Sequence, residues 1–303
     1  MKRRLLPILM TLVLVCALPI WAAFVTSGDV TNPLVCTAGA TSPPDTAATR
    51  LKSAISNGGD VRLTEDIEIS ETLVVTRDVT LDLNGHVLKM TGDGSVLKVS
   101  DRATLTITDS SAAKSGTITG GNAEYGGGVY VDNNATLKMT GGCITGCHAS
   151  RGGGGIYSSG NLYMGGTAKI EKCTGSDDAI WNREKSDIYA DGGTVDGTGN
   201  NQGTIKRSEG VTAVTVFKKT VYNQQAGTIE AGMYNETVEN NGTITGGTFY
   251  GAVMIRKGTL SWVSTGSISG GTFYGSIVNE AGPEQVTGGT FAVRFDTDGG
   301  SEI

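Results

Sequence analysis

The chain has 303 residues, of which 46 are glycine, 6 are proline and 18% are charged, and its formal net charge is −6. Collagen needs a strict three-residue glycine period and more proline, and a disordered chain needs more charge and fewer β-branched residues, so both classes are excluded. Glycine that alternates with short runs of Val, Ile, Leu and Thr instead indicates an all-β chain with many tight corners.

Residues 1–27 have the pattern of a secretory signal peptide. Residues 2–4 (Lys-Arg-Arg) give it a positively charged start, and residues 5–25 carry no charge. Such a leader is removed from the mature protein and predicts an extracellular location, secreted or on the cell surface; an uncleaved membrane anchor is the alternative. Contact with a membrane is expected only through this segment, because no later stretch has the ~18 apolar residues of a membrane helix. Without the leader the chain is more acidic and has no basic run, which argues against nucleic acid as a partner.

A short helix is predicted at residues 45–58, after a linker at residues 28–44. Its apolar residues follow one helical face: Ala47, Ala48, Leu51, Ala54 and Ile55. Asp45 can serve as the N-cap, and Gly58 stands where a helix commonly ends. Because a stack of β-strands exposes unpaired strand edges at its ends, we expect this helix to cap the first coil.

The first family of repeats occupies residues 59–190. Gly-Gly-Gly turns separate short apolar strands, and Ile118, Ile144 and Ile170 recur at intervals of 26 residues. We expect these three side chains to form one ladder inside the fold.

A second family of repeats occupies residues 216–291, where the repeated unit is Gly-Gly-Thr-Phe. This unit places Phe249, Phe273 and Phe291 at equivalent positions, and a second interior ladder is expected there. The polar residues 191–215 between the two families are predicted to be a connection, either a hinge or a loop without fixed structure.

Repeats of this length, each with two or three short strands, match the coils of a β-solenoid. One coil cannot bury its inward side chains alone, but coils stacked ~4.8 Å apart form a continuous core. Offsets of 18, 24 and 26 residues argue against a propeller, whose blades keep a steadier period. The predicted fold is therefore an all-β, right-handed parallel β-helix with a short N-terminal capping helix.

The segment Leu81-Asp82-Leu83-Asn84-Gly85-His86, together with the helix and the glycine-rich coils, resembles the pectin-lyase-like superfamily over residues 45–291. The coils are most similar to the repeat regions of large secreted bacterial surface proteins. The superfamily includes lyases, hydrolases and adhesins without catalysis, so the resemblance implies a fold and not an activity. Residues 292–303 resemble the start of a Listeria–Bacteroides (internalin-type) repeat, a small β-grasp surface module. This second resemblance implies that the chain is a fragment of a longer surface protein.

Asp177 and Asp178 resemble the adjacent aspartate pair of polygalacturonase-like enzymes, in which two carboxylates carry out glycoside hydrolysis. The other segments of that family, an Asn-x-Asp, a Gly-His-Gly turn and a more distant Arg-x-Lys pair, do not follow in order. The favoured interpretation is a pair of solvated turn acids. No catalytic residue is therefore predicted.

No cofactor and no metal site are predicted. The acids Glu65, Asp66 and Glu68 lack the spacing of a calcium loop and are expected to lie on the surface. The only histidines, His86 and His148, are too few for a histidine-rich metal site.

Cys147 and Cys173 are also 26 residues apart and should lie on successive coils. A separation of ~4.8 Å falls within the Cα–Cα range of disulfides, and export permits oxidation. A reduced ladder of small residues is the favoured interpretation, and a disulfide is the alternative. Zinc is not expected, since Cys143 and Cys147 have no matching second pair.

Tyr130, Tyr157 and Trp181 occupy equivalent places on three successive coils, and Tyr250 and Tyr274 do so further along the chain. Outward-facing stacked rings would form a strip that contacts glycans, because their faces are apolar and rigid. A packing ladder without a ligand explains the same spacing and is the favoured interpretation, and the glycan-contact strip is the alternative.

These features predict an exported cell-surface or secreted protein that acts by adhesion or glycan contact, without catalysis. Its partners would be either glycans or proteins of a host or cell surface. A passive structural stalk is one alternative, favoured if no aromatic or polar strip is exposed. A polysaccharide lyase or hydrolase is another, and it would need a groove that holds Asp177, Asp178 and a basic residue together.

Overall fold

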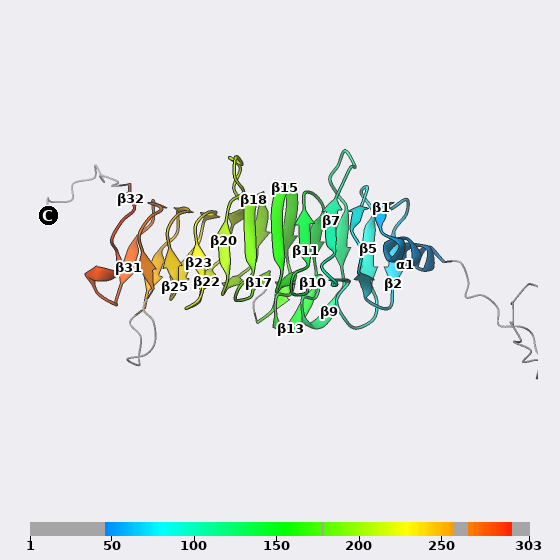
Figure 1. Ribbon diagram of the computed structural model, residues 1–303, viewed down its shortest axis with the longest axis horizontal. Coiled ribbons are helices and arrows are strands. Elements are labelled where there is room, and N and C mark those ends of the chain that lie inside the picture. Colours follow the sequence, from blue (N-terminus) through cyan, green and yellow to red (C-terminus); the bar gives the residue numbers. More distant parts are fainter. Residues whose placement is uncertain (1–45, 177–178, 257–265, 293–303) are drawn as a thin grey trace, which may run out of the picture. The chain divides into compact units, whose positions relative to one another are not determined.

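The computed structural model describes residues 46–176, 179–256 and 266–292, which form a stack of coils (Figure 1). Strands of neighbouring coils pair in parallel and build long sheets along the stack. The fold is thus a parallel β-helix with a helix at its N-terminal end, as the sequence predicts. The predicted leader and linker, at residues 1–44, and residues 293–303 of the predicted β-grasp module lie outside the described residues.

The largest sheet has two columns of strands, and the long strands β15 and β18 continue from one column into the other. The first column contains β1 (Gly59–Arg62), β4 (Val79–Asp82), β7 (Thr104–Thr108), β11 (Thr136–Met139), β15 (Asn161–Glu171), β18 (Asp187–Asp196), β20 (Thr204–Lys206), β23 (Thr228–Ile229), β26 (Thr243–Ile244) and β29 (Ser267–Ile268). The second column contains β2 (Ile67–Ile69), β5 (Val87–Met90), β8 (Thr117–Thr119), β12 (Cys143–Thr145), again β15 and β18, β21 (Val216–Phe217), β24 (Met233–Tyr234), β27 (Thr248–Phe249), β30 (Thr272–Phe273) and β32 (Thr290–Phe291).

Two further sheets complete the coils. The ten-stranded sheet contains β3 (Leu73–Val75), β6 (Leu97–Val99), β10 (Val129–Val131), β14 (Ile156–Ser158), β17 (Ile180–Asn182), β19 (Gly199–Asn201), β22 (Val221–Asn223), β25 (Val238–Asn240), β28 (Val253–Ile255) and β31 (Ile277–Asn279). The three-stranded sheet contains β9 (Asn122–Tyr125), β13 (His148–Gly152) and β16 (Thr174–Gly175). Figure 1 shows β9 and β13 at one side of the stack, next to β10. A short 3₁₀ helix, η1 (Pro283–Gln285), follows β31.

Inward side chains form ladders that run from coil to coil. Ile144 pairs with Ile118 on one neighbouring coil and with Ile170 on the other, and all three are fully buried. The ladder predicted from the 26-residue spacing is therefore confirmed.

The second predicted ladder is confirmed for Phe249 and Phe273, which are buried and stack with ring centroids 4.8 Å apart. Tyr234 and Phe217 extend this stack toward the N-terminus. Phe291 stacks on Phe273 at 5.3 Å, but its side chain is 49% exposed. The prediction of a buried position is wrong at Phe291, because this residue stands on β32, the last described strand of the stack.

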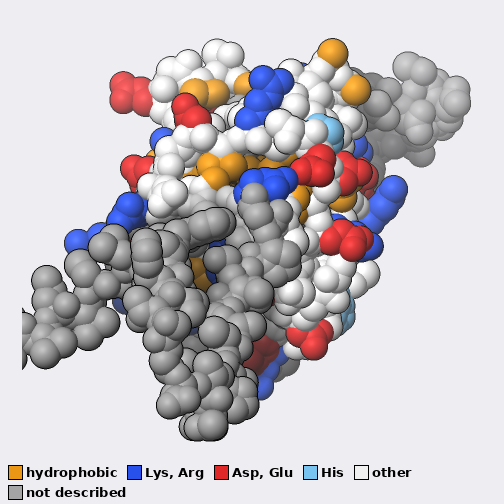
Figure 2. Space-filling model, turned by 90° about the vertical axis from the view of Figure 1, so that its right-hand side faces the viewer, with side chains coloured by type: hydrophobic (Ala, Val, Ile, Leu, Met, Phe, Trp, Pro, Cys, Tyr) orange, Lys and Arg blue, Asp and Glu red, His pale blue; other side chains and the backbone are white. Residues whose placement is uncertain are grey.

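Helix α1 (Ala47–Asn57) covers the first coil. Leu51 and Ile55 on its inner face are buried in the core, as the apolar pattern predicts. The N-cap is Thr46, whose Oγ1 accepts a backbone hydrogen bond of 3.1 Å within the first turn, whereas the predicted N-cap, Asp45, lies outside the described residues. Figure 2 looks onto this end of the stack and shows basic and acidic side chains intermingled on it.

The polar segment 191–215 is not a connection between two stacks. β18, β19 and β20 run through it, and its longest stretch without a strand is residues 207–215. Ile188 of β18 pairs with Ile205 of β20, and the end of β18 pairs with β21, so the stack continues through the segment. The prediction failed because several polar side chains of these coils lie inside the fold.

Four buried asparagines form a ladder through these coils. The side-chain amide of Asn182 donates a hydrogen bond to Asn201 Oδ1 at 2.8 Å. Asn201 donates in turn to Asn223 at 2.8 Å, and Asn223 donates to Asn240 at 2.7 Å. Each of the four is at most 1% exposed. Because a buried amide without partners is costly, the coil-to-coil repetition of asparagine is what makes this position stable.

Asp109 holds the turns between the first coils. Its carboxylate is buried and accepts backbone hydrogen bonds from Gly85 at 2.9 Å, Ser111 at 3.1 Å and Gly116 at 2.6 Å. Burial alone would raise the pKa of Asp109, but the hydrogen bonds, led by that from Gly116, outweigh it and hold the pKa below its usual value.

Asp109→Asn is expected to lower the free energy of unfolding at pH 7 by ~1–3 kcal/mol, because an amide NH₂ cannot accept the hydrogen bond from Gly116. The folded-state pKa of Asp109 lies below the unfolded value of ~3.9, so the carboxylate's contribution is present above that value and is lost as the pH falls through the folded pKa. The difference between wild type and variant should therefore narrow as the pH falls from ~5 toward ~2. Urea unfolding across this range measures it, and a difference that stays constant would contradict the assigned role.

Candidate functional site

Tyr130, Tyr157 and Trp181 lie side by side, as the sequence predicts. They are register partners in the middle of β10, β14 and β17 and stand on the outer face of the ten-stranded sheet. The ring centroids of Tyr130 and Tyr157 are 5.0 Å apart, and those of Tyr157 and Trp181 are 5.9 Å apart. Tyr157, however, is only 4% exposed. The three rings are therefore a packed column and not an open strip.

The three-stranded sheet covers the middle of this column. Tyr125, at the end of β9, packs against Tyr157 with ring centroids 4.8 Å apart and against Trp181 at 6.0 Å. Gly152 of β13 leaves room for the indole, since a Cβ atom at this position would lie 1.7 Å from Trp181 Cε3. Trp181 is thus a packing residue, and the open side of the aromatic cluster is at Tyr130.

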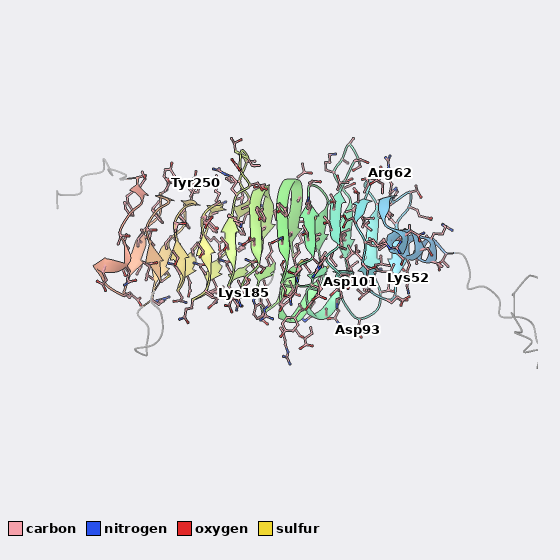
Figure 3. All side chains as sticks on the ribbon, in the orientation of Figure 1. Lys52, Arg62, Asp93, Asp101, Lys185 and Tyr250 are labelled. Atoms are coloured by element: carbon pink, nitrogen blue, oxygen red, sulfur yellow. The ribbon has the colours of Figure 1, made fainter. Side chains whose placement is uncertain are left out.

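An open groove of about 890 Å³ lies at that side, and we call it the tyrosine groove. Tyr125 and Tyr130 form its aromatic part. The rest of its lining is polar, charged or small: Asp93, Gly94, Ser95, Lys98, Asn122, Ala123, Glu124 and Ser150. In Figure 3, Asp93 lies at the edge of the molecule opposite to Arg62 and Tyr250.

Backbone pairing fixes one wall of the tyrosine groove. Gly94 and Asn122 exchange two backbone hydrogen bonds, of 2.7 and 3.0 Å, in an isolated antiparallel bridge. Gly94 has a φ of +118°, a conformation that residues with a side chain rarely adopt. The Asn122 side-chain amide donates a hydrogen bond to Asp93 Oδ1 at 2.9 Å. The two side chains are therefore held together at the groove.

The charges of the tyrosine groove are compensated by neighbours. Lys98 Nζ lies 3.6 Å from Asp132 Oδ2 and 5.2 Å from the centre of the Tyr130 ring. Arg151 pairs with Glu124 at 2.8 Å. Burial, and then the neighbouring Tyr157, raises the pKa of Tyr130.

Sequence reasoning missed Lys98, Tyr125 and Asp93 as groove residues. Lys98 alternates with two buried residues, as Tyr130 does, and it is the register partner of Tyr130. A strand-by-strand alignment would have found it. Tyr125 and Asp93 stand at a strand end and in a turn, where alternation carries no signal.

The other residues considered in the sequence lie apart from the tyrosine groove or outside the described part of the chain. Asp177 and Asp178 lie outside the described residues. Two of the three acids expected on the surface form exposed ion pairs, Glu65 with Arg50 and Glu68 with Lys89, and Asp66 Oδ1 lies 3.3 Å from His86 Nδ1. His148 Nδ1 is 3.0 Å from the hydroxyl of Thr174. Across residues 46–176, 179–256 and 266–292, no group of three His, Cys, Asp or Glu residues is placed to hold a metal.

Cys147 and Cys173 lie on successive coils, next to the paired residues of β13 and β16, and both side chains are buried. A hydrogen bond from Cys173 is the main cause that lowers the pKa of Cys147. Burial raises the pKa of the nearby Cys143 thiol to about 11. The reduced ladder and its alternative, a disulfide between Cys147 and Cys173, both stay predictions; the two residues are neighbours on successive coils, as either one requires.

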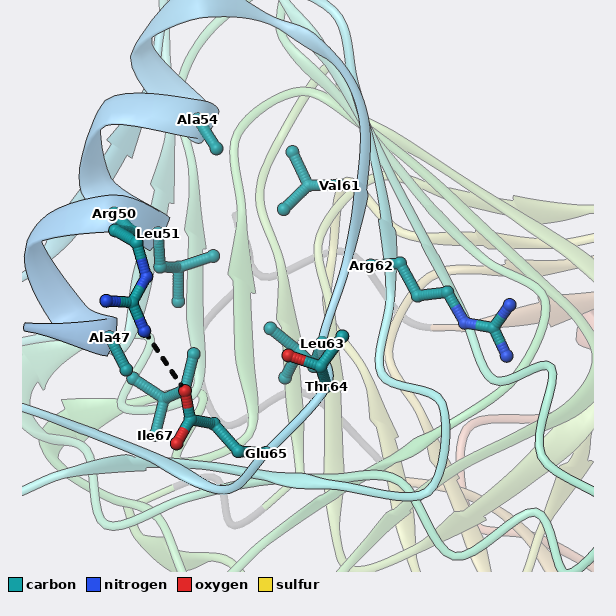
Figure 4. Close-up of a pocket in the computed structure, with 10 residues that line it drawn as sticks. All are labelled: Ala47, Arg50, Leu51, Ala54, Val61, Arg62, Leu63, Thr64, Glu65 and Ile67. Carbon is teal, nitrogen blue, oxygen red and sulfur yellow. Dashed lines mark hydrogen bonds and ion pairs between the residues drawn. The ribbon is translucent and has the colours of Figure 1, made fainter.

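A second, smaller hollow of about 150 Å³ lies between α1 and the first coil (Figure 4). Its lining is mostly apolar: Ala47, Leu51, Ala54, Val61, Leu63 and Ile67. Arg50 of α1 forms an ion pair of 3.2 Å with Glu65 beside it. Arg62 and Thr64 complete its lining, so this hollow is a seam between the helix and the core with charged residues at its rim.

Two other tyrosine pairs lie on the outer surface. Tyr163 and Tyr189 stack with centroids 4.0 Å apart, and burial, followed by a hydrogen bond with Tyr189, raises the pKa of Tyr163 to about 12. Tyr250 and Tyr274 stack at 4.9 Å and are 49% and 52% exposed. Neither pair belongs to the tyrosine groove.

Comparison with known proteins finds no family model, no curated protein and no solved structure that matches the chain. The resemblances to the pectin-lyase-like superfamily and to the internalin-type repeat therefore stay expectations. Within the described ranges, no helix has the length and hydrophobicity needed to span a membrane.

Proposed function

We propose that this chain is an exported protein, secreted or on the cell surface, that contacts glycans through the tyrosine groove without catalysis. The charged start and uncharged stretch of residues 1–27 support export. Glycan contact rests on one observation: two tyrosine rings share an open groove with a row of hydrogen-bonding side chains.

A sugar ring presents apolar C–H groups on its faces and hydroxyl groups around its edge. The rings of Tyr125 and Tyr130 offer rigid apolar surface to such a face. Asp93 accepts hydrogen bonds, Lys98 donates them and Asn122 does both. A sugar hydroxyl group can therefore find a partner whether it donates or accepts a hydrogen bond. A groove of this composition suits a ligand that is apolar on one side and hydroxylated on the other.

Tyr130→Ala is expected to weaken glycan binding by roughly five- to tenfold, because the loss of one aromatic contact removes about 1–1.4 kcal/mol. A glycan array screened with the purified protein identifies the ligand, and titration calorimetry with that glycan compares the variants. Tyr222→Ala is the matched control, since Tyr222 follows in the same outer column on β22 but does not line the groove. Equal losses in both variants, or an array on which no glycan binds, would remove the support for this function; the second result would favour the passive stalk.

A further inference from the structure

The tyrosine groove has a charge pattern that selects among sugars. Asp93, Glu124 and Lys98 are the charged residues of its lining. Lys98 and Glu124 are already neutralised by Asp132 and Arg151, at 3.6 and 2.8 Å. The hydrogen-bond partner of Asp93 is the neutral amide of Asn122, so its negative charge is not balanced in the same way. The lining of the groove therefore has a slight excess of negative charge.

This pattern disfavours anionic ligands. A carboxylated or sulfated sugar would meet the Asp93 carboxylate, and it could reach the Lys98 ammonium only in competition with Asp132. A neutral sugar hydroxyl, by contrast, donates to Asp93 without disturbing either ion pair. Charge-assisted hydrogen bonds of this kind are the strong ones, which makes Asp93 the residue with the largest effect on selectivity.

We propose that the tyrosine groove takes neutral hexose oligosaccharides and rejects uronic-acid and sulfated ones. The proposed contacts are packing of one sugar ring against Tyr125 and the open edge of Tyr130, whose faces are covered by Lys98 and Tyr157, and hydrogen bonds from its hydroxyl groups to the Asp93 carboxylate. Asn122 positions Asp93 through the hydrogen bond of 2.9 Å, and the Gly94–Asn122 bridge holds that part of the groove in place. This inference rests on the proposed glycan contact and names the chemical class of the ligand.

The test is titration calorimetry of the full chain with neutral hexose hexamers (gluco- and manno-oligosaccharides), an oligogalacturonate hexamer, a sulfated oligosaccharide and a glucosamine hexamer. We expect binding of at least one neutral hexamer, with an affinity that changes less than about twofold between 50 and 500 mM NaCl, because no ion pair forms with the ligand. Asp93→Asn should weaken this binding by roughly tenfold. Asp101→Asn is the control: it removes the same charge from an exposed turn outside the groove and should leave binding unchanged.

The possible failures are distinguishable. Binding of only charged sugars, with affinity that falls steeply with salt, would overturn the inference and leave glycan contact standing. Binding of a neutral hexamer that Tyr130→Ala abolishes but Asp93→Asn does not would overturn the role of Asp93. No binding of any sugar class would overturn the proposed function and this inference together. Thermal melting of each variant shows whether it is folded, so a loss through misfolding is recognised.

Discussion

Asn201→Ala is expected to lower the free energy of unfolding by about 2–5 kcal/mol, the largest effect of the substitutions considered for stability. The change removes the acceptor of the Asn182 amide and the donor to Asn223 Oδ1, which are 2.8 Å away on the two neighbouring coils. Both partners stay buried, so water cannot replace the lost hydrogen bonds. Denaturant unfolding of the purified chain measures the change.

The matched control for this prediction is Asn133→Ala. Asn133 is exposed in the turn after β10, and its side chain supports no coil-to-coil hydrogen bond that the structure shows. A surface change of this kind should stay within about 0.5 kcal/mol of wild type. If the two variants lost equal stability, the asparagine ladder would not be the stabilising feature of these coils.

Gly152→Ala is expected to cost about 3 kcal/mol, because the added methyl group would overlap the Trp181 ring and the packed column has no space to absorb it. Trp181→Ala should relieve this clash. When Trp181 is already alanine, Gly152→Ala should therefore lower the free energy of unfolding by less than about 1 kcal/mol. A double-mutant cycle measured by denaturant unfolding gives the coupling between the two residues.

Gly165→Ala is the control that shows what replacing a strand glycine by alanine costs where no side chain is in the way. Gly165 lies in β15, and its nearest neighbours would be 3.8 Å or more from an added Cβ. It should tolerate alanine with little change. Independent, additive effects of Gly152→Ala and Trp181→Ala would contradict the packing of the indole against β13.

The repeat spacing was enough to predict the coils and much of the core. A 26-residue interval places Ile118, Ile144 and Ile170 one above another, because each coil must bury the same positions against its neighbours. The same logic placed Tyr130, Tyr157 and Trp181 in one column. What it could not give is the exposure of that column, which depends on Tyr125 from a different strand.

Two errors have a common physical origin. The polar composition of residues 191–215 predicts a connection, although Asn201 is buried there with Asn182 and Asn223 as amide partners on the neighbouring coils. Hydropathy cannot distinguish a solvated asparagine from one in a ladder; only the recurrence of asparagine at the ends of successive strands can. The tyrosine groove was missed for a related reason, since Asp93 and Asn122 meet beside an antiparallel bridge between Gly94 and Asn122, the first residue of β9, which no strand periodicity predicts.

The measurement that tests the central claim most directly is hydroxyl-radical footprinting of the tyrosines, with and without the glycan found on the array. Tyr125 and Tyr130 should be protected by the bound glycan, while Tyr250 and Tyr274, which are half-exposed on other coils, should be oxidised equally in both samples. Protection at Tyr250 and Tyr274 instead, or no protection of Tyr125 and Tyr130 at saturating glycan, would contradict the assignment of the tyrosine groove as the glycan-contact site.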